Sequence, residues 1–375
     1  MAYWIINSII VFALCVLFAG VLIPEILLIA YRRNLFDEVD ERKIHKGSIP
    51  RLGGIAFEPV ILLSIALTLG GNLLFDCDAF ADVFGADAKL MVTAFCAIQM
   101  LYLLGMADDL IGIKYRAKFV VQIICAVLLI AGGCWFKTLA GALGIEGLSP
   151  WIGYPFTAVV IVFLINAINL IDGIDGLASG LSSIASGIYG FSFLLLGQYD
   201  LAILSFATLG VLVPFFYFNV FGDVTKHSKI FMGDTGSLTI GLILSILGIR
   251  LYTTPESACI DFNPAVIAFS PLIIPCFDVL RVYTIRIRQH RSPFLPDKNH
   301  IHHKFLAAGM PPRTAMVTII SISALFCIIN LTLSNFLNIN LIIILDIACW
   351  FLFNAWVNNR IEMHKKKNEE LKIEN

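Results

Sequence analysis

Long apolar stretches, separated by short polar ones, make up most of this chain. A helix of about 20 apolar residues is long enough to cross the hydrocarbon core of a bilayer. Eleven stretches reach or approach that length, so the pattern predicts an all-α polytopic membrane protein with about eleven transmembrane helices. The predicted spans cover residues 4–30, 52–74, 90–107, 119–136, 152–171, 177–197, 201–221, 236–254, 263–283, 315–334 and 338–357.

The composition supports the same class, because 58% of the residues are hydrophobic and only 14% are charged. A soluble domain has about 25% charged residues. The first stretch lacks a small-residue cleavage site and is followed by similar stretches, so we interpret it as a retained span rather than a signal peptide. The nine cysteines are scattered, which is typical of small apolar core residues. Cys77 and Cys259 fall in loops on the same predicted side and could form a disulfide.

The distribution of basic residues predicts the orientation, because loops rich in Lys and Arg remain cytoplasmic. If the spans alternate, one side carries 23 of the 26 Lys and Arg residues, and only Lys89, Lys137 and Arg250 lie on the other. We therefore predict an outside N-terminus and a cytoplasmic C-terminus. We also predict a single integral-membrane domain, residues 1–357, with a polar site at its cytoplasmic face, followed by a charged cytoplasmic tail, residues 358–375.

One polar stretch interrupts the apolar sequence between two predicted spans. Asn166, Asn169, Asp172 and Asp175 follow one another at intervals of three residues, which places neighbours on one face of a helix. Burying such groups near a bilayer without partners is costly. Two glycines in the same stretch allow a turn or a close backbone approach. The stretch therefore favours a metal or phosphate site over a purely structural polar cluster.

Further polar clusters fall on the same predicted cytoplasmic side, at residues 37–54, 105–122, 219–237 and 278–303. The second cluster contains Asp108 and Asp109, whose adjacent carboxylates either share a cation or raise one pKa. Alone, such a pair is equally typical of a solvated loop. Lys114, Arg116 and Lys118 follow within ten residues and could bind phosphate, which favours a functional site.

Residues 231–237, with the sequence FMGDTGS, place glycines on either side of Asp234 just before a predicted span. Glycines permit a tight turn whose backbone N–H groups face an anion at a helix start, and the Asp234 carboxylate can bind a hard cation. A simpler interpretation is that Asp234 or Thr235 caps the following helix. The two interpretations are compatible.

His300, His302 and His303 form a cluster beside Asp297. Three histidines allow a zinc site, but the nearest soft ligand, Cys276, falls within a predicted span, and the carboxylates elsewhere favour a hard ion. We favour imidazoles that contact sugar hydroxyls and phosphates.

Five motifs, in this order along the chain, resemble those of the polyprenyl-phosphate N-acetylhexosamine-1-phosphate transferase family. They are DEVDERKIHKGSIPRLGG, the Asp108-Asp109 pair, NLIDGIDGLA, IFMGDTGS and DKNHIHH. The HIHH spelling and the eleven spans are more similar to the bacterial branch that starts the synthesis of O-antigen lipopolysaccharide, enterobacterial common antigen or wall teichoic acid. The branch that transfers phospho-MurNAc-pentapeptide is less similar.

The resemblance implies a reaction at the bacterial inner membrane, in which UDP-N-acetylglucosamine and undecaprenyl phosphate give undecaprenyl-diphospho-N-acetylglucosamine and UMP. Mg²⁺ or Mn²⁺ would be the cofactor. Physical constraints agree, because two anions react only where a cation and basic residues neutralise their repulsion. The expected partners are undecaprenyl phosphate, a UDP-N-acetylhexosamine and the lipid bilayer, with no nucleic acid. A homodimer is compatible with the resemblance.

The resemblance also implies roles for individual residues. Asp234 and Asn166 match metal-binding positions, and Asp108 and Asp109 match an acidic pair of which one deprotonates or orients the lipid phosphate. The residues expected to bind substrate are Lys46, Lys118, Asn169, Asp172, Asp175, Asn219, His300, His302 and His303. We favour a single displacement over a covalent aspartyl intermediate, because a phosphomonoester with a second pKa of about 6 is already a nucleophile at neutral pH. The sequence is compatible with both routes.

Two features depart from the family pattern. Some relatives carry a third acid in the pattern D-D-x-x-D, whereas this chain has Gly112, which argues against a role for a third carboxylate. The segment at residues 219–229 is longer than in many relatives and adds Lys226 and His227 near the expected nucleotide.

Two alternatives remain open. Intramembrane polar residues also occur in transporters and lipid carriers, although those place charge near the membrane midplane, and release of UMP would separate the two classes. The sugar could also be another N-acetylhexosamine, because pockets discriminate such relatives weakly.

Overall fold

The computed structural model describes residues 1–33, 35, 49–258, 262–290 and 299–373. All regular secondary structure among these residues is helical, and ten of the described helical segments are long and apolar enough to cross a membrane. The predicted all-α polytopic membrane fold is therefore confirmed. Lys46, Cys259 and Asp297 lie outside the described residues.

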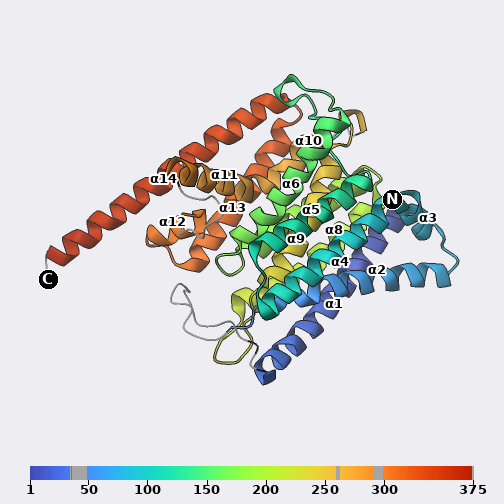
Figure 1. Cartoon of the computed structure of the whole chain (residues 1–375), viewed down its shortest axis with the longest axis horizontal. Coiled ribbons are helices and arrows are strands. Elements are labelled where there is room, and N and C mark those ends of the chain that lie inside the picture. Colours follow the sequence, from blue (N-terminus) through green and yellow to red (C-terminus); the bar gives the residue numbers. More distant parts are fainter. Residues whose placement is uncertain (34, 36–48, 259–261, 291–298, 374–375) are drawn as a thin grey trace.

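Each of the eleven predicted spans corresponds to helix in the structure (Figure 1). The first half of the chain contains α1 (Ala2–Arg33), η1 (Gly53–Ala56), α2 (Phe57–Leu74), α3 (Ala79–Ala86), α4 (Ala88–Ile111), α5 (Tyr115–Ala131), η2 (Ala142–Gly144), α6 (Pro150–Ile171) and α7 (Leu177–Leu195). The second half contains α8 (Tyr199–Phe221), α9 (Gly233–Tyr252), η3 (Glu256–Ala258), α10 (Pro264–Phe269), η4 (Ser270–Leu272), α11 (Ile273–Arg288), α12 (Ile301–Ala307), α13 (Pro312–Leu333) and α14 (Ile339–Ile373).

The helix α5 is shorter than the predicted span at residues 119–136. It has 17 residues, which corresponds to about 26 Å at 1.5 Å per residue. It ends before Gly132 and Gly133, and Gly133 has a φ of +98°, a conformation that favours glycine. The eleven predicted spans are therefore ten long helical segments and this shorter helix.

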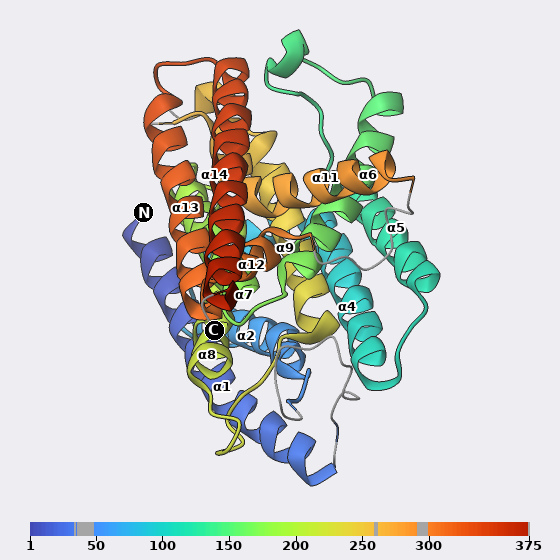
Figure 2. The same cartoon turned by 90° about the vertical axis from the view of Figure 1, so that its left-hand side faces the viewer.

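The predicted span at residues 263–283 is broken. Pro271 lies in η4, and Pro275 lies in the first turn of α11. Proline lacks a backbone N–H and its ring crowds the preceding turn, so a helix bends or breaks near it. Figure 2 shows that α11 crosses the direction of α13 and α14. After the break, Asp278 and Arg281 of α11 contact residues 299–301, at the start of the histidine cluster.

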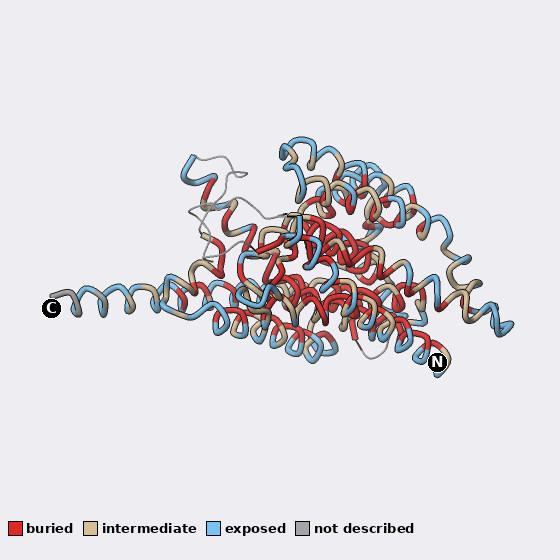
Figure 3. The backbone as a smooth tube through the Cα atoms, turned by 90° about the horizontal axis from the view of Figure 1, so that it is seen from below, coloured by how far each residue is buried: buried red, intermediate tan, exposed pale blue. Residues whose placement is uncertain are grey.

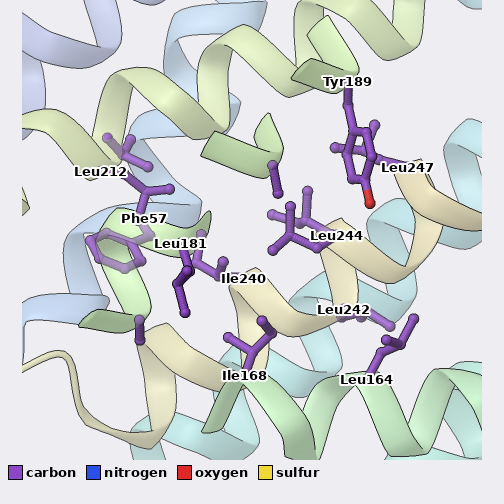
Figure 4. Close-up of a cluster of buried hydrophobic side chains, with 14 of the residues drawn as sticks. Phe57, Leu164, Ile168, Leu181, Tyr189, Leu212, Ile240, Leu242, Leu244 and Leu247 are labelled. Atoms are coloured by element: carbon purple, nitrogen blue, oxygen red, sulfur yellow. The ribbon is translucent and has the colours of Figure 1, made fainter. Parts of the chain in front are cut away.

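The helix α9 lies at the centre of the molecule, where it packs against α4, α6 and α7. Almost all of its residues are buried, and the buried backbone concentrates in the same central region (Figure 3). Figure 4 shows Ile240, Leu242, Leu244 and Leu247 of α9 among apolar side chains of neighbouring helices. Inside a membrane such packing depends on close van der Waals contact, which small residues promote. The apolar body of α9 thus fixes the position of its polar N-terminal end.

The last helix, α14, continues without interruption through residue 357 to Ile373 and projects from the body (Figure 1). Its middle part packs against α12. The rings of Phe305 and Phe353 lie 5.8 Å apart, and Lys304 Nζ donates to Asn354 Oδ1 at 3.1 Å. The cytoplasmic placement of the tail, like the outside position of the N-terminus, stays a prediction.

Candidate active site

Six helix ends bring the predicted site residues together. The ends of α4, α6 and α8 and the starts of α5, α7 and α9 carry or flank most of these polar side chains. Side-chain hydrogen bonds join α4, α5, α6 and α9, and another joins the start of α7 to the end of α8. Because successive helices run in opposite directions, these ends belong to one end of the bundle. The polar groups therefore gather at one end of the helices rather than midway along them.

Asp109 on α4 anchors the start of α9. Its Oδ1 accepts the backbone N–H of Asp234 at 2.8 Å, and its Oδ2 accepts the backbone N–H and the hydroxyl of Thr235 at 2.9 and 2.5 Å. The N-cap position of α9 is Met232, which makes no side-chain capping bond. The prediction that Asp234 or Thr235 caps this helix is therefore wrong. Both residues lie inside the first turn, and a carboxylate from another helix accepts its free N–H groups.

Glycines allow these segments to approach closely. A methyl group added at Gly105 of α4 would lie 2.5 Å from the Thr235 Cα, and one added at Gly54 would lie 2.0 Å from the Gly236 nitrogen. The backbone N–H groups of Gly53 and Gly54 also donate to the carbonyls of residues 231 and 232 at 3.0 and 2.9 Å. Any larger side chain at these positions would push α9 away from α4 and η1.

Lys118, near the start of α5, joins two carboxylates. Its Nζ lies 2.5 Å from Asp108 Oδ2 and 2.5 Å from Asp234 Oδ2. Asp108 Oδ1 also accepts the backbone N–H of Ile113 at 2.6 Å, which closes the turn after α4. Gly112 has a φ of +71° in that turn, a backbone conformation that favours glycine. This is the position at which some relatives carry the third acid of the D-D-x-x-D pattern.

Asn169, rather than Asn166, contacts Asp234. The Asn169 amide donates to Asp234 Oδ1 at 3.1 Å and to Ser237 Oγ at 2.8 Å. Asn166 lies one turn earlier on α6 and donates to Gln122 Oε1 at 2.8 Å and to the Val162 carbonyl. Rotation of an amide by 180° exchanges its oxygen and nitrogen, so Asn169 can offer an oxygen at the same place.

The three carboxylates form a group that could hold a metal ion. One oxygen from each of Asp108, Asp109 and Asp234 lies within 4.8 Å of the others. Carboxylate and amide oxygens are hard ligands of the kind that Mg²⁺ and Mn²⁺ prefer. Among the described residues, no Cys or His belongs to this group. The residues present therefore fit a hard divalent cation.

The turn between α6 and α7 is tied to the end of α8. Asp175 Oδ2 pairs with Lys229 Nζ at 2.5 Å. Asn219 Oδ1 accepts the backbone N–H of Gly176 at 2.6 Å, and its amide donates to the Ile230 carbonyl at 2.8 Å. Asn219 was predicted to bind substrate, but both ends of its amide hold backbone groups of this chain.

Asp172 lies in the same turn, and its pKa is raised. Burial, together with the nearby carboxylates of Asp234 and Asp175, raises its pKa to about 7, and Arg51 opposes the shift only in part. At neutral pH this carboxyl is therefore close to half protonated.

The longer segment after α8 has a defined conformation. Asp223 Oδ1 accepts the backbone N–H and the hydroxyl of Thr225 at 2.8 and 2.7 Å, and His227 has a φ of +54°. The His227 ring lies 4.2 Å from the ring of Tyr31 on α1. His227 of this segment thus lies against α1.

A buried aspartate organises the histidine cluster. Asp278 on α11 is completely buried; its Oδ2 lies 2.8 Å from His300 Nδ1, and its Oδ1 accepts the backbone N–H of Ile301 at 2.9 Å. Arg281 also pairs with this carboxylate at 2.8 Å. The break in the predicted ninth span therefore serves to fix the start of α12.

His302 connects α12 to the turn after α6. A methyl group added at Gly173 would lie 2.1 Å from His302 Nε2, and the rings of His302 and His303 are 4.2 Å apart. Burial and His303 lower the pKa of His302 to about 3, so its imidazole is neutral at physiological pH. Among the described residues, its Nδ1 has no hydrogen-bond partner.

Comparison with known proteins identifies the family. Residues 91–252 match the glycosyl transferase family 4 profile. An undecaprenyl-phosphate alpha-N-acetylglucosaminyl 1-phosphate transferase from Yersinia pestis is 32% identical over 80% of this chain and 78% of the relative. The chain belongs to glycosyl transferase family 4. Proteins with the same name from Escherichia coli (strain K12) and Salmonella typhi are each 31% identical, over 87% and 92% of this chain and 84% and 92% of their own lengths.

This membership confirms the family predicted from the five motifs. The region that matches family 4 contains the three carboxylates, Lys118 and the residues of the α6–α7 turn, whereas the histidine cluster follows it. Three residues in or beside the candidate site had no predicted role, namely Ser237, Lys229 and Asp278. A polar residue inside an apolar span was the available signal for Asp278.

Proposed function

We propose that this chain transfers N-acetylglucosamine 1-phosphate from UDP-N-acetylglucosamine to undecaprenyl phosphate, which gives undecaprenyl-diphospho-N-acetylglucosamine and UMP. The observation that carries the proposal is the group of Asp108, Asp109 and Asp234 with Lys118, at one end of the helical bundle. The names of the relatives support the same reaction.

This group suits a reaction between two phosphates. One substrate is a membrane lipid and the other a water-soluble anion, so they can meet only at a membrane surface. Carboxylates bind a divalent cation and Lys118 adds a positive charge, and these are the two means by which proteins neutralise phosphoryl groups. A site at the cytoplasmic face of a bacterial inner membrane, where UDP-sugars are found, fits the predicted orientation.

The cation would be held by Asp234 and Asp108, with Asn169 taking the position that we predicted for Asn166. When bound, Mg²⁺ or Mn²⁺ would neutralise charge on the diphosphate and so favour attack on phosphorus. Asp109 is a positioning residue in this proposal, because both of its oxygens hold the first turn of α9. Asp108 is then the member of the pair that orients the lipid phosphate.

The reaction proceeds as a single displacement. An oxygen of the lipid phosphate attacks the phosphorus that carries the sugar, the bond from this phosphorus to the bridging oxygen breaks, and UMP leaves with that oxygen. The lipid phosphate has a second pKa of about 6 by analogy with other phosphomonoesters. It is therefore largely dianionic at neutral pH and does not require a strong base. Asp172, Asp175 and the histidines on α12 contact the nucleotide and the sugar phosphate.

The experiment that tests the sugar is analysis of the lipid product. The purified protein is incubated with undecaprenyl phosphate, Mg²⁺ and one UDP-sugar at a time, and the lipid is examined by mass spectrometry. We expect undecaprenyl-diphospho-N-acetylglucosamine from UDP-N-acetylglucosamine and little product from UDP-N-acetylgalactosamine. A preference for the second donor would replace the sugar but keep the reaction class, whereas no diphospholipid from any donor would contradict the proposal.

A further inference from the structure

The Lys118 ammonium group occupies the space between two of the carboxylates that could hold a metal. Its Nζ lies 2.5 Å from Asp108 Oδ2 and 2.5 Å from Asp234 Oδ2, and the lysine side chain is 23% exposed. Asp108 and Asp234 are two of the three carboxylates that could hold a metal ion. One cationic side chain therefore already neutralises the oxygens on which the proposed function depends.

Lys118 and a divalent cation cannot use these two oxygens together. A bound Mg²⁺ lies about 2.1 Å from its oxygen ligands, so an ammonium group on the same oxygens would lie within a few ångströms of it. Two cations at such a separation repel each other strongly in a partly buried site. Binding of one must therefore displace the other.

The carboxylates are held independently of the lysine. Asp108 Oδ1 accepts the backbone N–H of Ile113, and Asp234 Oδ1 accepts the amide of Asn169. Asp109 fixes the backbone of the Asp234 turn. Lys118, by contrast, is a long flexible side chain on the first turns of α5, so it is the part of the group that can move.

We propose that Lys118 and the divalent cation are alternative counter-ions of Asp108 and Asp234. The lysine neutralises the two carboxylates in the metal-free protein, and binding of the cation releases the ammonium group to contact the diphosphate of the nucleotide sugar. This inference rests on the proposed function for the second role of Lys118, but the exchange itself concerns the cation alone. The lysine thereby lowers the affinity for the cation and couples its binding to that of the substrate.

The test is the affinity of the full-length protein for Mn²⁺ in detergent without substrates, measured by electron paramagnetic resonance. Loss of the competing charge in Lys118→Met should lower the Mn²⁺ dissociation constant by about tenfold or more. Lys118→Arg keeps the charge and should bind Mn²⁺ within about threefold of the unmodified protein. Lys114→Met removes an exposed positive charge at the N-cap of the same helix and should change the affinity by less than about twofold.

An unchanged or weaker Mn²⁺ affinity in Lys118→Met, or no Mn²⁺ binding by any of these proteins, would overturn the exchange. Size-exclusion chromatography of each variant checks that it is folded. At saturating Mn²⁺, Lys118→Met should still release UMP at least about tenfold more slowly, because the ammonium group is then missing from the diphosphate. Tighter Mn²⁺ binding together with no UMP from the unmodified protein would contradict the proposed function and leave the exchange intact.

Discussion

Asp109 on α4 accepts the backbone N–H of Thr235 at the start of α9, at 2.9 Å, although 126 positions separate them in the chain. The contact joins the acidic pair to the Gly-Asp-Thr-Gly-Ser motif. Asp234 is the neighbour of Thr235, so the position of one candidate metal ligand depends on the carboxylate of another helix. This relationship makes Asp109 a support of the site.

Replacement of Asp109 by Asn should destabilise the start of α9. One oxygen becomes an NH₂ group that faces a backbone N–H, and an unsatisfied buried donor costs about 1–3 kcal/mol. We expect a lower thermal unfolding midpoint and slower UMP release for Asp109→Asn, measured in detergent by tryptophan fluorescence and a UMP assay. Asp108→Asn is the control, because the backbone N–H that Asp108 accepts is that of Ile113 and not one of α9, and its midpoint should fall less. An equal or greater fall for Asp108→Asn would contradict the supporting role.

Asn169 and Asn166 should differ in their effect on the cation. Loss of a group that binds or orients a metal ligand commonly lowers metal affinity by about 10- to 100-fold. We therefore expect Asn169→Leu to weaken Mn²⁺ binding by at least about tenfold, and Asn166→Leu, which loses its bond to Gln122, to weaken it much less. Titration with Mn²⁺ measures both. A greater loss of Mn²⁺ affinity in Asn166→Leu than in Asn169→Leu would instead favour Asn166 as the metal ligand.

Gly173 should not tolerate a side chain. The added methyl group of Gly173→Ala would lie 2.1 Å from His302 Nε2, so His302 or the turn must move. A misplacement of about 1 Å at a catalytic site can slow turnover by about 100-fold, and we expect at least a tenfold loss of UMP release with the fold retained. Gly147→Ala, where an added methyl group meets nothing within 4 Å, is the control. Similar activity of the two variants would remove His302 and this turn from the site.

Asp172 should make stability depend on pH. Its pKa is about 7 in the folded protein and about 3.9 in an unfolded chain. Between these values the folded state binds more protons, so the contribution of Asp172 to stability is greatest at low pH and is lost as the pH rises toward 7. The unfolding midpoint of the unmodified protein should fall between pH 5 and pH 8 by about 2 °C or more beyond that of Asp172→Asn. Equal falls would show that Asp172 does not titrate in this range.

The helices were largely predictable because each apolar stretch is nearly long enough to span a bilayer and is bounded by polar residues. The break at Pro271 and Pro275 was not predicted, since the stretch is apolar throughout and proline within a membrane helix does not always break it. Likewise, hydropathy cannot show that α5 ends at Ala131, because the residues that follow remain largely apolar.

The site was predictable as a set of residue types on one side of the membrane, but not as a set of contacts. Asn166 and Asn169 lie on the same face of α6, and a spacing of three residues does not decide which of them meets Asp234. That choice depends on how far α6 is shifted along α9. The capping of α9 by Asp109 is a contact between segments far apart in the sequence. The N-cap position, Met232, makes no side-chain capping bond, and the local sequence does not show which distant residue accepts the free N–H groups.

The most direct measurement is the release of UMP by the purified protein, with undecaprenyl phosphate, UDP-N-acetylglucosamine and Mg²⁺. The assay is run with and without the lipid and with and without EDTA, beside Asp234→Ala. We expect UMP that requires the lipid, disappears with EDTA and is abolished in a folded Asp234→Ala protein. UMP release that persists in EDTA or in Asp234→Ala would contradict the assigned cation site. No UMP from a folded, unmodified protein with any UDP-sugar would contradict the transferase itself and favour a carrier.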